Sequence, residues 1–312
     1  VGSEMCIRDR PACDAGQRFA GMFRAGQEPG RIIQGGFQML GKLIKYEFKA
    51  LYKKILLCVL GGMLISLLTL LLFQLAVTSG GNNIMLQLFW SSGMIFTVLA
   101  LAAVGILTLV FIIQRFYTNL YKDEGYLSFT LPVTPSQQLW AKLISGAFWT
   151  VISGAGVIVS FGLLFGGIIQ AAGNYTGENI FAYITTSIEY ILSVTGIQPG
   201  LFVAELLVSL LISVFSNMMI IYLCITLGSA VAAKHKVLIA ILLYFAITMG
   251  LSWVTGLVNI IVAGISFNGM PALEAGGAYH IVTAVNSALY ICIFGAAFGI
   301  CKSIMTKRLN LE

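Results

Sequence analysis

The stretch RFYTNLYKDEGYLSFTLPVTPSQQLWAK, residues 115–142, is the longest polar interruption between apolar segments on the side of the chain that carries the basic residues. One long apolar run ends just before it and another begins just after it, so two membrane spans are expected to meet here. Within it, Thr134-Pro135-Ser136-Gln137 matches a helix capping box with proline at the first helical position. The pattern predicts an ordered helix start next to a membrane span. The loop that precedes this helix is a segment that a soluble partner could bind.

The overall composition is that of a membrane protein. Hydrophobic residues make up 58% of the 312-residue chain and charged residues only 10%, whereas soluble proteins carry about 25% charged residues. Several apolar runs reach the length of about 20 residues that a bilayer-spanning helix needs. The six runs cover residues 55–76, 94–113, 143–168, 202–227, 237–262 and 281–301. They predict an all-α fold, a polytopic membrane helix bundle with six transmembrane helices within residues 55–312.

Basic residues are confined to one side of the predicted bundle. After Met39, every Lys and Arg falls before the first span, around residues 115–142 or 234–236, or after the last span. The other connecting segments contain neither Lys nor Arg; they are residues 77–93, 169–201 and 263–280. Because positively charged loops stay in the cytoplasm, the pattern predicts that both termini are cytoplasmic.

Residues 39–54 are expected to form an amphipathic helix that lies in the cytoplasmic membrane interface. Apolar side chains recur at helical spacing on one face of this segment. The opposite face carries Lys42, Lys45, Lys49, Lys53 and Lys54. A lysine near an anionic leaflet contributes about 1 kcal/mol to membrane binding, so Lys42, Lys45, Lys49 and Lys53 are candidate lipid contacts. The alternative is a simple cytoplasmic extension of the first span.

Residues 1–38 differ from the remainder of the chain. They are polar, rich in Arg and Gly, and have no apolar periodicity. They also lack the apolar central region of a signal peptide. We expect translation to begin at Met39 and the preceding residues to be non-native; a disordered native tail is the alternative.

The connection between the third and fourth spans, residues 169–201, is the largest on the side without basic residues. Its apolar side chains recur at helical spacing, which predicts a short helix of about residues 178–194 on the outer face of the membrane. A re-entrant segment is the alternative. Glu205, the only acidic residue within a predicted span, follows in the first turn of the fourth span. It is a candidate substrate-path residue, or an interface residue favoured by the positive end of a helix.

Small residues on the spans predict positions where helices approach closely. The candidates are the pairs Gly162/Gly166 and Gly295/Gly299 and the serines Ser209, Ser213 and Ser216.

The chain lacks the residue patterns that support catalysis or cofactor binding. Residues 36–42 match GxxxxGK, but Leu43 replaces the Ser or Thr that a phosphate-binding loop requires. His235 and His280 are expected at opposite faces of the bundle, so they cannot share a metal ion. The cysteine positions indicate no disulfide framework. We therefore expect no enzyme activity, no bound cofactor or metal, and no nucleic-acid partner.

Two stretches carry a resemblance to a known family. MLGKLIKYEFKA at residues 39–50 and the stretch of residues 115–143 resemble type-2 ABC transporter permeases of Firmicutes. The DEGYLxFTLP core at residues 123–132 is the more specific piece. The resemblance runs from Met39 to the C-terminus and implies a multi-pass protein of the bacterial plasma membrane. It also implies a separate ABC ATPase subunit that uses the ATP, and a second permease that is either another copy or a paralogue.

The resemblance further implies that residues 115–142 form the loop that couples to the ATPase. The candidate coupling residues are Tyr121, Asp123, Glu124, Gly125, Tyr126, Phe129, Leu131 and Pro132. The acidic pair would face basic or amide groups of the ATPase, while the aromatic side chains fill its groove; a solvated loop is the alternative. The implied function is the permease subunit of an ATP-driven exporter that works by alternating access. The alternative is a non-transporting membrane protein, such as a sensor or an assembly factor.

Overall fold

The described part of the chain is entirely helical and contains no strand. The computed structural model describes residues 29–79, 83–121, 134–173, 180–196, 198–231, 236–269 and 275–307. Its helices are α2 (Pro29–Thr78), α3 (Ile84–Tyr121), α5 (Pro135–Gly173), α6 (Ile180–Thr195), α7 (Pro199–Val231), α8 (Lys236–Gly269) and α9 (Ala275–Lys307). The predicted all-α class is therefore confirmed for these residues.

Six of these helices are long and apolar enough to cross a membrane. The candidate spans are Leu40–Thr78, Ile84–Tyr121, Pro135–Ile169, Pro199–Val231, Lys236–Val262 and Tyr279–Thr306. Each contains one of the apolar runs predicted from the sequence, and the helices extend beyond the runs. Such helices suit a bilayer because all their backbone hydrogen bonds are made internally. The chain is thus a multi-pass α-helical membrane protein.

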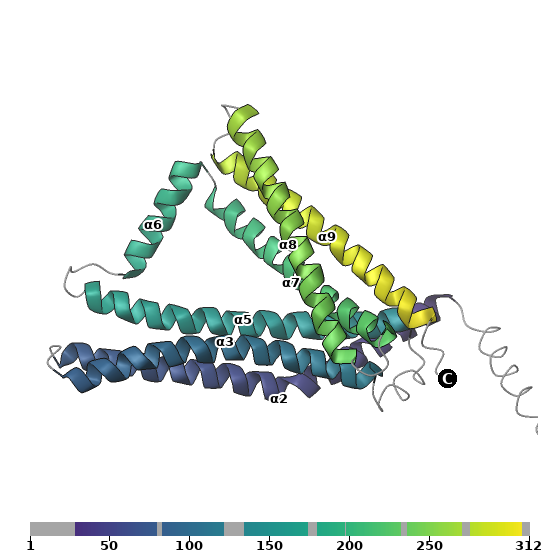
Figure 1. Cartoon of the computed structure of the whole chain (residues 1–312), viewed down its shortest axis with the longest axis horizontal. Coiled ribbons are helices and arrows are strands. Elements are labelled where there is room, and N and C mark those ends of the chain that lie inside the picture. The colour runs from purple at the N-terminus through teal and green to yellow at the C-terminus, as the bar shows by residue number, and fades with distance from the viewer. Residues whose placement is uncertain are drawn as a thin grey trace, which may run out of the picture.

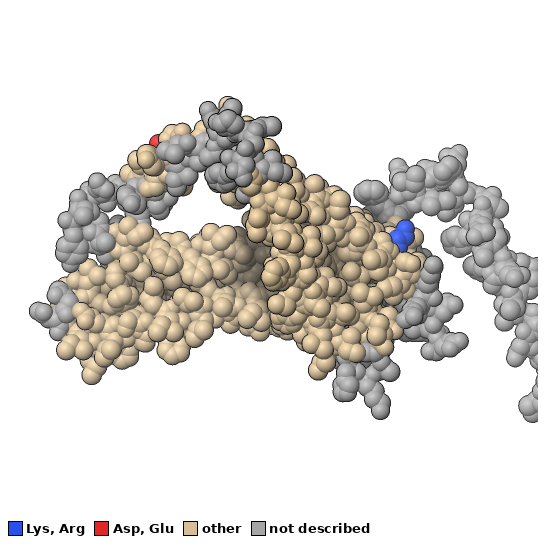
Figure 2. Space-filling view, turned by 45° about the horizontal axis from the view of Figure 1, so that its top comes forward, with Lys and Arg blue, Asp and Glu red and all other residues tan. Residues whose placement is uncertain are grey.

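The helices form two three-helix groups that converge at one end (Figure 1). In one group α2 packs on α3 and α5, and in the other α7 packs on α8 and α9. Helix α6 connects the far end of α5 to the start of α7, at the open end of this V-shaped arrangement. The described surface on the face drawn in Figure 2 is almost entirely uncharged. A basic group is visible near the end where the groups converge, and an acidic group is visible far from that end.

The core lies where the two groups meet. Phe116 of α3 and Tyr222 of α7 are each 1% exposed, and their rings stack with centroids 4.0 Å apart and an interplanar angle of 5°. Gly146 of α5 permits this approach, because a Cβ there would lie 2.7 Å from the Tyr222 hydroxyl. Lipid tails are as apolar as these side chains, so close packing and hydrogen bonds, rather than hydrophobic transfer, hold the groups together.

The predicted start of α5 is confirmed in detail. The backbone N–H of Thr134 donates to Gln137 Oε1 at 3.0 Å, and the backbone N–H of Gln137 donates to Thr134 Oγ1 at 3.4 Å. This is the reciprocal pattern of a capping box, with Pro135 as the first helical residue. Helix α3 continues to Tyr121, so the stretch 115–142 consists largely of the ends of two helices.

The predicted N-terminal amphipathic segment is part of α2, and no helix boundary separates it from the first span. Residues 29–38, within the expected tail, form the first turns of the same helix, whereas residues 1–28 lie outside the described residues. The candidate lipid contacts Lys42, Lys45, Lys49 and Lys53 are exposed. The continuous helix is compatible with both alternatives, so contact with the membrane interface and a cytoplasmic position both stay predictions.

The short helix expected between the third and fourth spans is confirmed as α6. It is followed by Gly196, whose φ of 68° is the left-handed conformation that commonly ends helices. Its location on the outer face stays a prediction.

The predicted small-residue packing pairs are wrong for contacts within this chain. Gly162, Gly166, Gly295 and Gly299 all face open space at the position a Cβ would occupy. The close approach of α5 to α2 occurs instead at other glycines. A Cβ at Gly156 would lie 2.5 Å from Val59 Cγ1, and one at Gly167 would meet Leu70. Glycine spacing alone therefore did not identify the face of α5 that packs on its neighbour.

Candidate functional site

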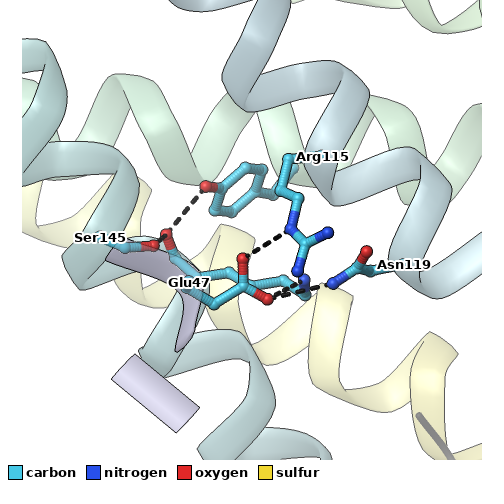
Figure 3. A network of polar contacts seen from close by, with 6 residues as sticks. Glu47, Arg115, Asn119 and Ser145 are labelled. Atoms are coloured by element: carbon cyan, nitrogen blue, oxygen red, sulfur yellow. Dashed lines mark hydrogen bonds and ion pairs between the residues drawn. The ribbon is translucent and has the colours of Figure 1, made fainter. Parts of the chain in front are cut away.

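A buried carboxylate on α2 is the centre of the largest polar network in the described part of the chain. Glu47 is 6% exposed. Its Oε1 accepts hydrogen bonds from Lys142 Nζ at 2.8 Å and Asn119 Nδ2 at 3.1 Å, and its Oε2 accepts one from Arg115 Nε at 3.1 Å (Figure 3). Both carboxylate oxygens are thus engaged by charged or amide donors, the arrangement that a buried carboxylate requires.

The donors come from two helices that flank one segment of the chain. Arg115 and Asn119 lie one turn apart on the last part of α3, so they share a face. Lys142 lies in the second turn of α5. Residues 122–133, which connect α3 to α5, are outside the described residues. Glu47 therefore joins α2 to both ends of the stretch 115–142, for which a coupling role is a prediction.

The two cations differ in their surroundings. The Lys142 side chain is 7% exposed and that of Arg115 is 32% exposed. One carboxylate and two cations carry a formal net charge of +1. Removing one partner of a buried ion pair costs about 3–5 kcal/mol, because the remaining charge is left without compensation. We therefore expect the Glu47–Lys142 contact to contribute more to stability than the Glu47–Arg115 contact.

A second contact extends the network to the other helix group. The Tyr222 hydroxyl of α7 donates to the backbone carbonyl of Lys142 at 3.0 Å, and the Ser145 hydroxyl donates to the same carbonyl at 3.0 Å. The Tyr222 ring stacks on Phe116, the residue after Arg115. Helices α2, α3, α5 and α7 are thus linked around Lys142, at the point where the two groups converge.

Most of the predicted coupling residues lie outside the described residues: Asp123, Glu124, Gly125, Tyr126, Phe129, Leu131 and Pro132. Tyr121 is described and is the last residue of α3. It is half-buried and packs against the core, with its ring centroid 6.3 Å from that of Phe116. This Tyr121 ring contacts its own chain; a role for it in binding an ATPase stays a prediction.

Glu205, the predicted substrate-path residue, has a partner that the sequence did not indicate. His280 Nδ1 lies 2.8 Å from both carboxylate oxygens. Glu205 is in the second turn of α7, and His280 is near the start of α9. Along α7 the pair is therefore distant from Tyr222, the residue of this helix that contacts Lys142. No group of three potential metal-ligating side chains occurs among the residues that the structure describes.

Glu47 was missed by the sequence reasoning, although a signal was present. Leu40, Ile44, Leu51 and Ile55 recur at helical spacing, and Glu47 falls on this same stripe. Its neighbours on the stripe, Leu51 and Ile55, are 4% and 0% exposed. An acidic residue on the apolar face of a lysine-rich helix predicts a buried carboxylate that needs cationic partners.

Comparisons with family models, with curated proteins and with solved structures found no match to this chain. The class that the structure itself defines is a multi-pass α-helical membrane protein with a buried ion-pair network at one end.

Proposed function

We propose that this chain is the membrane-spanning permease subunit of an ATP-driven exporter, working with a separate ATPase subunit. The observation that carries the proposal is the position of Glu47. Its carboxylate binds Arg115 before residues 122–133 and Lys142 after them. A force applied to this segment would therefore act on α2, α3 and α5 as one unit.

The contacts support a route from that segment to the second helix group. Tyr222 binds the Lys142 carbonyl and stacks on Phe116, so displacement of the ends of α3 and α5 would also displace α7. Rigid-body rocking of packed helix groups is a common way to alternate access between the two sides of a membrane. In this mechanism the V-shaped arrangement of Figure 1 would change its angle as the partner binds and hydrolyses ATP.

The proposal has further components that follow from the sequence resemblance and the charge pattern. The network would lie on the cytoplasmic side of a bacterial plasma membrane, where an ATPase is accessible. A second permease, either another copy or a paralogue, would complete the transporter. ATP would be bound by the partner alone, because this chain has no phosphate-binding loop of the required sequence.

The direct test is to look for an ABC ATPase reading frame beside this gene and to co-purify its product with this chain, followed by ATPase assays in lipid vesicles. We expect a stable complex whose ATP hydrolysis changes when the permease is present. The charge-reversed permease Glu47→Lys, selected for intact membrane insertion, should bind the ATPase yet lose this effect. If the wild-type chain binds no ATPase and leaves its activity unchanged, a sensor or assembly function replaces this proposal.

A further inference from the structure

A polar groove lies between α7 and α9, within two helices that are long and apolar enough to span a membrane. It has a volume of about 380 Å³. Its lining is Leu206, Ser209, Leu210, Ser213, Thr283, Asn286, Ser287 and Tyr290. Six of these eight residues carry a hydroxyl or amide group. A second groove, between α5, α7 and α9, is instead lined by Trp140, Leu211, Ile212, Phe215, Ile291 and Phe294. The polar side chains are thus gathered on one face.

Polar groups in a membrane span are costly when they face lipid, and they usually face protein or a water-filled cavity. Hydrogen bonds within α7 satisfy some of these polar groups. Ser209 Oγ donates to the Leu206 carbonyl, and Ser213 Oγ donates to the Leu210 carbonyl. Each hydroxyl retains acceptor capacity toward the groove. Asn286 Nδ2 donates to Asn259 Oδ1 of α8 at 2.8 Å, which holds one wall of the groove in place.

An acidic group marks one end of this groove. Glu205 precedes Ser209 by four residues and His280 precedes Thr283 by three, so their contact lies one helical turn before the nearest polar lining residues. The Glu205 side chain remains 29% exposed. The groove therefore combines a carboxylate near one end, a hydrogen-bonding floor and the apolar edges Leu206 and Leu210.

We propose that this groove is a hydrated binding site for an amphiphile whose headgroup carries a primary ammonium. The ammonium would bind the Glu205 carboxylate, beside His280 or in its place. Other headgroup donors and acceptors would reach Ser209 and Ser213, since the helix rises about 12 Å between Glu205 and Ser213. The apolar tail would lie along Leu206 and Leu210 and continue into the bilayer. A headgroup whose only charge is a phosphate or carboxylate is disfavoured, because the groove lining contains neither Lys nor Arg.

The ammonium could belong to an aminophospholipid or to a lysine-bearing peptide that the protein exports. Both share the chemistry that Glu205 recognises. This site would give the proposed exporter a ligand class. It rests on the proposed function only in treating the ligand as the exported substrate. Binding to the groove requires no ATPase, so its test is independent of whether the chain couples to one.

The first experiment measures hydration of the groove by cysteine labelling of the full-length protein in phosphatidylcholine vesicles, with its native cysteines replaced. Ser209→Cys is compared with the control Leu207→Cys. Residue 207 lies at almost the same depth on the opposite face of α7, and the native Leu207 side chain is 55% exposed. A membrane-impermeant methanethiosulfonate should label Ser209→Cys at least tenfold faster. Equal labelling rates for the two variants would overturn the proposal. Slow labelling of Ser209→Cys together with a disulfide between two copies of the chain would also overturn it, because the groove would then be a contact between copies.

The second experiment measures ligand recognition by protection of Ser209→Cys. Dodecylamine should slow labelling at least fivefold, while dodecanol and dodecyltrimethylammonium, which lacks N–H donors, should protect weakly. Glu205→Gln should remove the protection, and His280→Gln, which retains the carboxylate, should preserve it. Equal protection by all three amphiphiles would overturn the proposal, as would unchanged protection in Glu205→Gln. Phosphatidylethanolamine vesicles and an amphipathic lysine peptide then distinguish a lipid from a peptide ligand.

Discussion

Glu47 Oε1 lies 2.8 Å from Lys142 Nζ, although the two residues are separated by 95 positions in the sequence. Both side chains are buried, at 8% and 7% exposed. The contact joins the first membrane helix to the helix that follows the polar segment 122–133. It is therefore a direct physical connection between the N-terminal part of the chain and the end of the predicted coupling loop.

Glu47→Gln should lower stability because it removes the carboxylate that the buried Lys142 and the partly exposed Arg115 both bind. We expect a loss of about 3–5 kcal/mol, the usual cost of breaking a buried ion pair. The measurement is the free energy of unfolding in mixed micelles. The double variant Glu47→Gln with Lys142→Met should be less unstable than the sum of the single variants, and simple additivity would contradict a direct interaction.

Lys142→Met and Arg115→Met should differ in effect, because the Lys142 side chain is 7% exposed and that of Arg115 is 32% exposed. We expect the Lys142 substitution to be the more destabilising by about 1–2 kcal/mol, since partly exposed ion pairs contribute little. Thermal unfolding of the two purified variants in one detergent gives the comparison. The reverse order would show that Arg115 is the main counter-ion of Glu47.

Gly146→Ala should destabilise the junction of α5 and α7. The added Cβ would lie 2.7 Å from the Tyr222 hydroxyl and 3.3 Å from Ile112 Cγ2, and overpacking of this kind costs about 1–3 kcal/mol. Gly154→Ala is the matched control, because open space surrounds its Cβ position. That control should be neutral or stabilising by up to about 1 kcal/mol. Equal unfolding free energies for the two variants would contradict the close approach.

Asp123→Ala combined with Glu124→Ala should weaken capture of an ABC ATPase while leaving the permease inserted in the membrane. Surface charge changes usually alter stability by less than about 0.5 kcal/mol, whereas truncating one side of a buried interface pair costs about 2–5 kcal/mol of binding. Co-purification and substrate-stimulated ATP hydrolysis are the measurements. Gly125→Val tests the backbone separately. Normal ATPase capture by the double variant would indicate a solvated loop.

Cysteine accessibility should give the orientation predicted from the basic residues. Single cysteines at Asn174 and Ala272 should react with an impermeant reagent from outside the cell. Cysteines at Ser128 and Lys236 should react only after the membrane is opened. Labelling of Ser128→Cys from outside intact cells would contradict the predicted topology.

The sequence by itself determined the features that depend on neighbouring residues. Six membrane-length helices, the helix between the third and fourth spans and the Thr134–Gln137 capping box were all predicted. Hydropathy and helical periodicity are local properties, and a capping box is completed within four residues. Lipid exposure reinforces these signals, because a spanning helix needs an apolar surface whichever neighbours it contacts.

Only the tertiary structure decided which faces of those helices meet. Glycine pairs at plausible spacing face open space, while Gly146 and Gly156 contact neighbouring helices. The Glu205–His280 pair spans 75 positions and the Glu47–Arg115 pair spans 68. In an apolar solvent, hydropathy does not distinguish the face of a helix that contacts lipid from the face that contacts protein. These pairings therefore follow from the packing of whole helices, which sets the distance between side chains far apart in the sequence.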